Sequence, residues 1–280
     1  MIFEVKDLSF SYADSKSRRD SKNKGESSNR NDSGMVLRNI SFELRDGDFA
    51  CILGPNGTGK STLFKCILNR LQKYDGDVII DGTNVKNMNY RTLSKYMAYI
   101  PQTFDNVYDF TVSETVLFGT AGSMNAFEAP KKEQEEKCIE ALRKVGMEEF
   151  YDRSMNKLSG GEKQMVYIAR AVAQNAKMLI MDEPTSALDF GNQIKALECI
   201  QGLSKEGYIV LTSTHDPQQA LQYSNKTLAI KSGQVLGFGN TRDIINEELL
   251  TELYNQDIRI FEVGGMRVVT AITEYTHSKE

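Results

Sequence analysis

The sequence contains few of the residues that usually bind structural metal ions. It has only two histidines and four cysteines, Cys51, Cys66, Cys138 and Cys199, and no two of these form a C-x-x-C pair. This pattern disfavours a zinc site. Cys51 lies in an apolar run typical of a strand, and Cys66 lies in a segment with helical spacing. The cysteines are therefore expected to be buried, reduced thiols, which is typical of cytosolic proteins.

Long apolar runs and an excess of basic residues are also lacking. No run approaches the roughly 20 residues that span a bilayer, and residues 1–7 do not resemble a secretory signal. A role at a membrane would therefore need a partner protein. The net charge of −4 disfavours a broad nucleic-acid surface. The 280 residues, 40% of them hydrophobic, are enough for a substantial soluble core.

One segment, about residues 13–34, consists mostly of Ser, Lys, Arg, Asn, Asp and Gly. Because it cannot bury enough apolar area to offset the entropy of ordering it, we expect a flexible loop. A docking role stays open, but a lengthened hairpin loop is the simpler interpretation.

The hydrophobic pattern elsewhere alternates between strand and helix. Residues 2–10 and 36–44 alternate apolar and polar side chains, as half-buried strands do, whereas residues 60–71 have helical spacing. Helical patterns dominate from about 112 to 173, and 178–181 is a fully apolar run of strand length. The pattern predicts an α/β fold with a largely parallel central sheet and an inserted helical block.

A glycine-rich motif lies between an apolar strand (49–53) and the helical segment. It reads Gly54, Pro55, Asn56, Gly57, Thr58, Gly59, Lys60 and Ser61, which fits G-x-x-x-x-G-K-[ST]. Glycines let the backbone N–H groups converge on phosphate oxygens, and the helix N-terminus attracts negative charge. We predict that these residues and Thr62 bind ATP, with Lys60 on the β- and γ-phosphates and Ser61 on Mg²⁺. The structural alternative is a glycine-rich turn before a capped helix.

An acidic pair, Asp182 and Glu183, directly follows the apolar run 178–181. At the carboxyl end of a buried strand both carboxylates should emerge near the phosphate loop. We expect Asp182 to hold Mg²⁺ and Glu183 to orient or activate the attacking water. The alternative is a polar strand end that leads into the turn at Pro184.

A third motif, Leu158-Ser159-Gly160-Gly161-Glu162, resembles the signature of the ATP-binding cassette (ABC) family. Its S-x-x-E pattern also predicts a capping box at the start of a helix. The resemblance covers nearly the whole chain except the polar insert. It implies one nucleotide-binding domain over residues 1–280, with a P-loop NTPase (RecA-like) core, an N-terminal antiparallel β subdomain and a helical subdomain at about 104–170. It also implies that Ser159, Gly160, Gly161 and Glu162 bind the ATP of the other subunit, which requires a head-to-tail homodimer.

Other positions match the family residue by residue. Tyr12 resembles the aromatic residue that stacks on adenine, and Gln102 resembles the glutamine that reaches Mg²⁺. Residues 186–189 resemble the loop that contacts the partner subunit. His215 resembles the switch histidine that contacts the γ-phosphate, so that Lys60, His215 and Mg²⁺ would offset the charge that develops in hydrolysis. The sequence departs from the family at Met165, where arginine is common, and at the insert after Tyr12.

The resemblance implies an ATPase that powers a transporter at the cytoplasmic face of the cell membrane. Residues 103–112 would lie beside a groove for a permease helix. Residues 214–221 and the segment 249–260 look most like importers of iron-siderophore, haem, cobalamin or molybdate compounds. Specificity would then lie in a permease and a substrate-binding protein. A soluble ATPase of iron-sulfur cluster assembly and an exporter stay open as alternatives.

Overall fold

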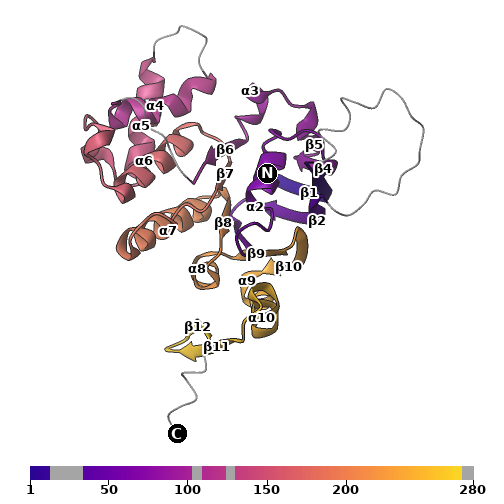
Figure 1. Ribbon diagram of the computed structural model, residues 1–280. Coiled ribbons are helices and arrows are strands. Elements are labelled where there is room, and N and C mark those ends of the chain that lie inside the picture. The colour runs from indigo at the N-terminus through magenta and orange to yellow at the C-terminus, as the bar shows by residue number, and fades with distance from the viewer. Residues whose placement is uncertain (13–33, 103–108, 124–129, 273–280) are drawn as a thin grey trace, which may run out of the picture. The chain divides into compact units, whose positions relative to one another are not determined.

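The computed structural model describes residues 1–12, 34–102, 109–123 and 130–272 (Figure 1). Most of the polar insert and residues 103–108 of the predicted permease-facing loop lie outside these ranges. The chain divides into two compact units. The first unit comprises Met1–Leu44, Cys51–Asn87 and Thr214–Glu280, and the second comprises Arg45–Ala50 and Met88–Ser213.

The strands are β1 (Ile2–Ser11), β2 (Met35–Arg45), β3 (Phe49–Leu53), β4 (Asp75–Ile80), β5 (Thr83–Asn84), β6 (Met97–Ile100), β7 (Met178–Met181), β8 (Ile209–Thr214), β9 (Lys226–Lys231), β10 (Gln234–Asn240), β11 (Ile258–Val263) and β12 (Met266–Ala271). The α-helices are α2 (Lys60–Ile67), α3 (Tyr90–Leu93), α4 (Val112–Thr120), α5 (Lys132–Lys144), α6 (Gly160–Ala173), α7 (Phe190–Lys205), α8 (Pro217–Tyr223), α9 (Thr241–Ile244) and α10 (Glu247–Tyr254).

The predicted α/β architecture is confirmed. One sheet has the order β2-β1-β4-β5, and its β1–β4 and β4–β5 pairs are antiparallel. A six-stranded sheet has the order β10-β9-β3-β8-β7-β6, in which β6, β7 and β8 are parallel. All four residues of β7 are buried, as expected for a strand covered on both faces.

One predicted helix is shorter than expected. The spacing over residues 60–71 predicted a helix to Leu71, but α2 ends at Ile67. Asn69 adopts a positive φ of 55°, a left-handed conformation that Asn tolerates better than most residues and that stops the helix. Leu71 therefore lies outside the helix whose apolar face it was expected to share.

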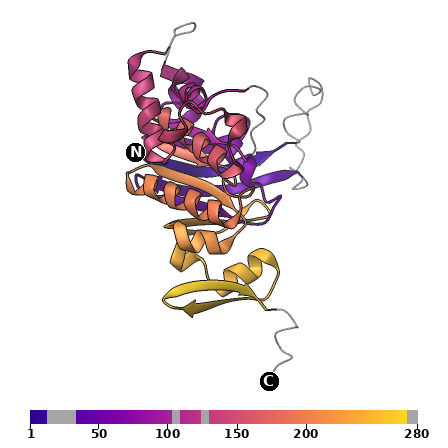
Figure 2. The same ribbon diagram turned by 90° about the vertical axis from the view of Figure 1, so that its left-hand side faces the viewer.

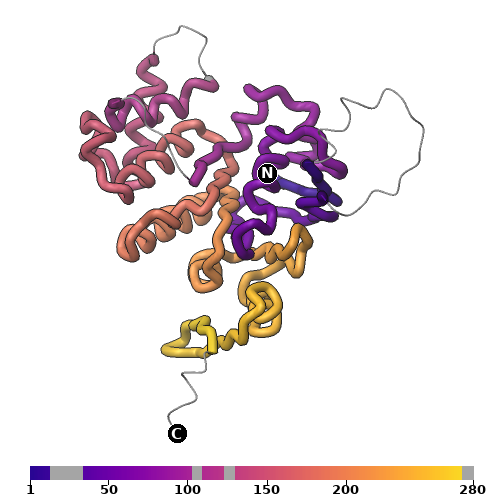
Figure 3. Tube along the Cα trace, viewed as in Figure 1, coloured from indigo at the N-terminus to yellow at the C-terminus, as the bar shows by residue number. Residues whose placement is uncertain are grey.

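In the second unit, α4, α5 and α6 pack against one another into a helical group (Figure 3). Buried Val116, Leu142 and Ile168 supply apolar side chains from each of the three helices. The predicted helical block is therefore a packed group with its own apolar contacts. Its sequence pattern was visible because each helix repeats apolar residues every three or four positions.

The C-terminal part of the first unit contains α8, α9, α10 and the β11–β12 hairpin (Figure 2). The hairpin is a separate two-stranded sheet, with Phe261 opposite Val268 and Val263 opposite Met266. Because a lone hairpin is marginally stable, it depends on its contacts with neighbouring helices.

The prediction for the cysteines can be compared with the structure. Cys51, Cys66 and Cys138 are buried free thiols, as expected, whereas Cys199 is only partly buried. Burial raises the pKa of the Cys66 thiol to about 12. In the described ranges, no helix combines the length and apolar character needed to cross a membrane.

Candidate nucleotide-binding site

The predicted phosphate loop directly follows β3, and its backbone has a shape that needs glycine. Gly57 and Gly59 have φ angles of 83° and 102°, in the region that side-chain-bearing residues rarely adopt. A Cβ atom on Gly54 would lie 2.3 Å from the carbonyl oxygen of Ile230. Glycine at Gly54 therefore lets the loop pass close to β9, and the later glycines let it curl into the start of α2.

Lys60 is 6% exposed, so its ammonium group needs polar partners. Its Nζ donates to the carbonyl oxygens of Gly54 at 2.6 Å and Pro55 at 3.1 Å. The loop thus holds a positive charge inside its own turn. The N-terminus of α2 has no side-chain cap and no acidic residue in its first turn. A buried cation and an uncapped helix N-terminus are together suited to bind phosphate.

Tyr12 lies beside the start of α2. Its hydroxyl is 3.3 Å from Oγ1 of Thr62, and its ring packs edge-on to Phe10 with centroids 4.8 Å apart. The side chain is 44% exposed, so part of it is accessible to a ligand. The structure therefore brings Tyr12 to the phosphate loop, while adenine stacking stays a prediction.

His215 also belongs to the first unit, in the short link between β8 and α8. Its neighbour Thr214 accepts a hydrogen bond from the backbone N–H of Gly54 at 3.3 Å. The residue directly before the predicted switch histidine therefore makes a main-chain contact with the phosphate loop. The side chain of His215 is exposed, as contact with a nucleotide requires.

The acidic pair at the end of β7 is held by a serine to which the sequence analysis assigned no role. Ser213 is fully buried, and its Oγ donates to Oδ1 of Asp182 at 2.6 Å. The Ser213 Oγ also accepts a hydrogen bond from the backbone N–H of Glu183 at 2.9 Å. In the sequence, the only indication of a role for Ser213 is its place near the end of β8. The sequence does not reveal that β8 lies beside β7.

Glu183 is partly exposed and has a φ of 46°, which is uncommon for a residue other than glycine. Its Oε2 accepts from Nε2 of Gln102 at 3.3 Å, and the same amide donates to Oγ of Ser186 at 3.3 Å. The structure therefore brings together the predicted water-directing glutamate, the predicted metal-reaching glutamine and the start of the partner-contacting loop. Strained backbone at such a position is typical of functional sites.

The signature motif forms the start of α6, and the predicted capping box is confirmed. The backbone N–H of Glu162 donates to Oγ of Ser159 at 3.3 Å, and that of Ser159 donates to Oε2 of Glu162 at 2.7 Å. The latter bond lowers the pKa of Glu162. Ser159 and Gly160 are exposed, so a second molecule can reach them.

Gly161 lies where α6 approaches the N-terminus of α7. A Cβ atom there would lie 2.5 Å from Cγ of Asn192. Asn192 is held in place by Asp189, to which its backbone N–H and side-chain amide donate at 3.0 and 2.7 Å. Glycine therefore allows the signature helix to pack closely on the end of the predicted partner-contacting loop.

The predicted Mg²⁺ ligands are the Ser61 hydroxyl, the Asp182 carboxylate and the Gln102 amide. All three offer oxygen atoms, which is the donor type that Mg²⁺ prefers. Asp182 is buried and uses Oδ1 to accept from Ser213. A carboxylate has two oxygens, so this bond orients the group and leaves Oδ2 for a ligand. The donor types of these residues are therefore compatible with Mg²⁺.

Comparisons with known proteins identify the family of the chain. The sequence model of the ABC transporter family matches residues 37–186. The ferric enterobactin transport ATP-binding protein FepC of Escherichia coli is 32% identical over 240 residues, which cover 85% of this chain and 89% of FepC.

Two solved structures are also similar. One, described as a metal-chelate type ABC transporter in an inward-facing conformation, has a TM-score of 0.80 and 26% identity and covers 98% of both chains. Another, described as a dimeric ATP-binding cassette in a post-hydrolysis state bound to ADP and phosphate, has a TM-score of 0.68 and 26% identity over 86% of this chain and 99% of that one. With its P-loop NTPase fold and signature, the chain belongs to the ABC transporter family as one of its ATPases.

Proposed function

We propose that this chain is the ATP-hydrolysing subunit of an importer for an iron chelate or a related metal chelate. The main support is the likeness to a metal-chelate type transporter, which extends over 98% of the chain and so includes the C-terminal segment beyond the cassette motifs. The similarity to FepC, a ferric enterobactin transport protein, points to the same substrate class.

In this proposal the phosphate loop, Gly54 to Thr62, binds the phosphates of ATP. Lys60 exchanges the carbonyl oxygens of Gly54 and Pro55 for β- and γ-phosphate oxygens, which bear more negative charge. Tyr12 stacks on the adenine. The support is the combination of a buried ammonium group with an uncapped helix N-terminus in the same loop.

Glu183 orients or activates the attacking water, and His215 contacts the γ-phosphate. Ser61, Asp182 and Gln102 hold Mg²⁺, which when bound neutralises charge on the phosphate oxygens. Ser213 fixes both the Asp182 carboxylate and the Glu183 backbone, so neither group has to reorganise before hydrolysis.

Hydrolysis in this proposal requires a head-to-tail homodimer. Ser159, Gly160, Gly161 and Glu162 of one subunit bind the ATP held by the phosphate loop of the other. Support comes from the exposed start of α6 and from the similar cassette that is described as dimeric. The complete assembly would place two copies on permease subunits at the cytoplasmic face of the membrane and would receive substrate from a binding protein.

The test is to purify the tagged full-length chain from detergent-solubilised membranes of its native cell and to identify the integral membrane protein that copurifies. The resulting complex is reconstituted in proteoliposomes and assayed for ATP-dependent uptake of ferric chelates. A matched complex carrying Glu183→Gln is the control, because it should bind ATP without sustained uptake.

Chelate uptake that requires both ATP and Glu183 would support the proposal. Recovery of the chain only in a soluble complex with iron-sulfur assembly activity would overturn it in favour of the soluble alternative. ATP-driven movement in the opposite direction would instead identify an exporter.

A further inference from the structure

The switch histidine is connected to the C-terminal helix by a hydrogen bond. Only His215 and Asp216 separate the end of β8 from the start of α8. The Tyr254 hydroxyl, at the end of α10, donates to the carbonyl oxygen of His215 at 2.7 Å. A residue 39 positions away therefore fixes the peptide plane that follows the predicted switch residue.

The rest of this link is already constrained on both sides. Asp216 caps α8, with Oδ1 accepting from the N–H groups of Gln218 and Gln219 at 2.8 and 3.3 Å. Its own N–H donates to Oγ1 of Thr214 at 3.1 Å. The Asp216 N–H and the His215 carbonyl belong to one planar peptide group. Thr214 holds its N–H side, and Tyr254 holds its carbonyl side. The carbonyl group and the side chain of His215 are both attached to its Cα atom. A bond that fixes the carbonyl therefore also limits the direction in which the side chain leaves the backbone.

Tyr254 is itself held firmly. Lys231 of β9 donates to the carbonyl oxygen of Glu252 and, at 2.8 Å, to Oδ1 of Asn255, so its ammonium group binds on both sides of Tyr254. A cation at a helix C-terminus is favourable because the last carbonyl groups lack helical partners. Burial and nearby Asp216 raise the pKa of Tyr254, so the phenol keeps the proton that it donates.

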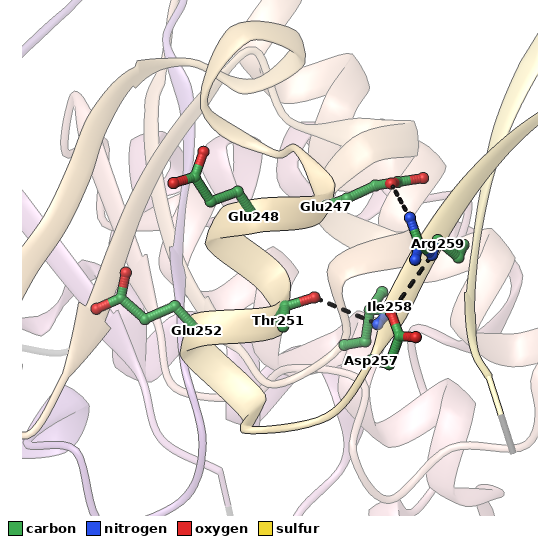
Figure 4. A pocket seen from close by; sticks show the side chains of 7 residues that line it. All are labelled: Glu247, Glu248, Thr251, Glu252, Asp257, Ile258 and Arg259. Atoms are coloured by element: carbon green, nitrogen blue, oxygen red, sulfur yellow. Dashed lines mark hydrogen bonds and ion pairs between the residues drawn. The ribbon is translucent and has the colours of Figure 1, made fainter.

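The β11–β12 hairpin connects α10 to α8. On one side, the N–H groups of Ile258 and Ile260 donate to Thr251 at 3.3 Å and to Glu247 at 2.9 Å, beside the acidic pocket shown in Figure 4. On the other side, the Gln218 amide donates to the carbonyl oxygen of Arg267 and accepts from the N–H of Val269, both at 3.0 Å. The hairpin thus joins the helix that carries Tyr254 to the helix that follows His215.

We propose that Tyr254 is a positioning residue for His215, and that α10 and the β11–β12 hairpin together hold Tyr254 in place. The inference rests on the proposed role of His215 in hydrolysis. Tyr254 contacts the backbone of His215 and acts on turnover only through the histidine. The C-terminal segment thereby becomes part of the hydrolytic machinery.

The test compares the full-length wild-type chain with Tyr254→Phe, His215→Ala and the double variant. Steady-state kcat and the Kd for ATP are measured for each. Tyr254→Phe should lower kcat about fivefold, the loss expected for one hydrogen bond, with Kd unchanged. In the His215→Ala background the same change should have no further effect, because no imidazole is left to position. Tyr90→Phe, at an exposed tyrosine, is the matched control.

The possible outcomes distinguish the two proposals. Wild-type turnover in His215→Ala would contradict the role of His215 itself. Impaired His215→Ala with unimpaired Tyr254→Phe, or equal losses in both backgrounds, would overturn only the positioning role. Lys231→Met provides a second variant that keeps the phenol but loosens α10. It should also lower kcat only when His215 is present, whereas a purely structural effect would appear in both backgrounds.

Discussion

The phosphate loop and the acidic pair differ in how their polar groups are held. In the loop, Lys60 bonds to carbonyl oxygens five and six positions away, so the geometry is local and built from main chain. At the acidic pair, Ser213 and Gln102 reach across 31 and 81 positions through side chains. A local backbone site is specified by a short motif, whereas a side-chain network depends on how distant strands pair.

The largest expected effect would separate binding from chemistry. Glu183→Gln keeps the shape of the side chain but removes the carboxylate, so turnover should fall about a hundredfold or more. ATP binding should stay intact, and the variant should accumulate as an ATP-bound dimer. Steady-state ATPase, nucleotide binding and size-exclusion chromatography measure these quantities, with Glu140→Gln, at an exposed residue of α5, as the control. Unchanged turnover in Glu183→Gln would remove the acidic pair from the mechanism.

The second-largest expected effect is a loss of ATP affinity when the phosphate loop is changed. Lys60→Ala removes a buried charge that should bind phosphate directly, so the Kd for ATP should rise about 10- to 100-fold. Lys65→Ala, at an exposed lysine of the same helix, should bind like the wild type. Calorimetric titration gives both values. If both variants bound ATP equally well, the buried ammonium would have only a structural role.

A smaller effect should follow from loosening the side-chain network. Ser213→Ala removes a donor to Asp182 and an acceptor for the Glu183 backbone, so kcat should fall about five- to tenfold. Ser204→Ala loses a buried hydroxyl bonded to Gln201 elsewhere in the second unit and is the matched control. Equal kcat values for the two variants would show that the Ser213 bonds matter for folding alone.

The smallest expected effect is a pH dependence of stability. It arises because a hydrogen bond to a carboxylate is lost when the carboxylate is protonated, whereas a bond between main-chain groups does not depend on pH. The Ser159 N–H lowers the pKa of Glu162 from its ordinary 4.5. This bond therefore contributes stability above pH 4.5, and the contribution is lost as pH falls through the lower folded pKa. The melting-temperature difference between wild type and Glu162→Gln, on the order of one degree, should shrink in that acid range. A constant difference down to pH 3 would contradict a role for the carboxylate charge.

Several features of the site were predictable from local pattern. The glycines of the phosphate loop, the capping box at Ser159 and the strand that ends at Asp182 each follow from residues within a few positions of one another. The proximity of Gln102 to Glu183 was expected only because the family resemblance assigned both to one reaction. Ser213 and Tyr254 were missed because their partners lie 31 and 39 positions away in the chain.

The sequence alone determined that this chain has a phosphate loop, a signature helix and an α/β order of elements, because turn geometry, helix capping and hydrophobic period are properties of short segments. Tertiary structure decided which serine orients the acidic pair and which tyrosine reaches His215. Strand pairing and the docking of the C-terminal hairpin bring those partners together. Contacts between distant segments produce no repeating pattern in the sequence from which they could be predicted.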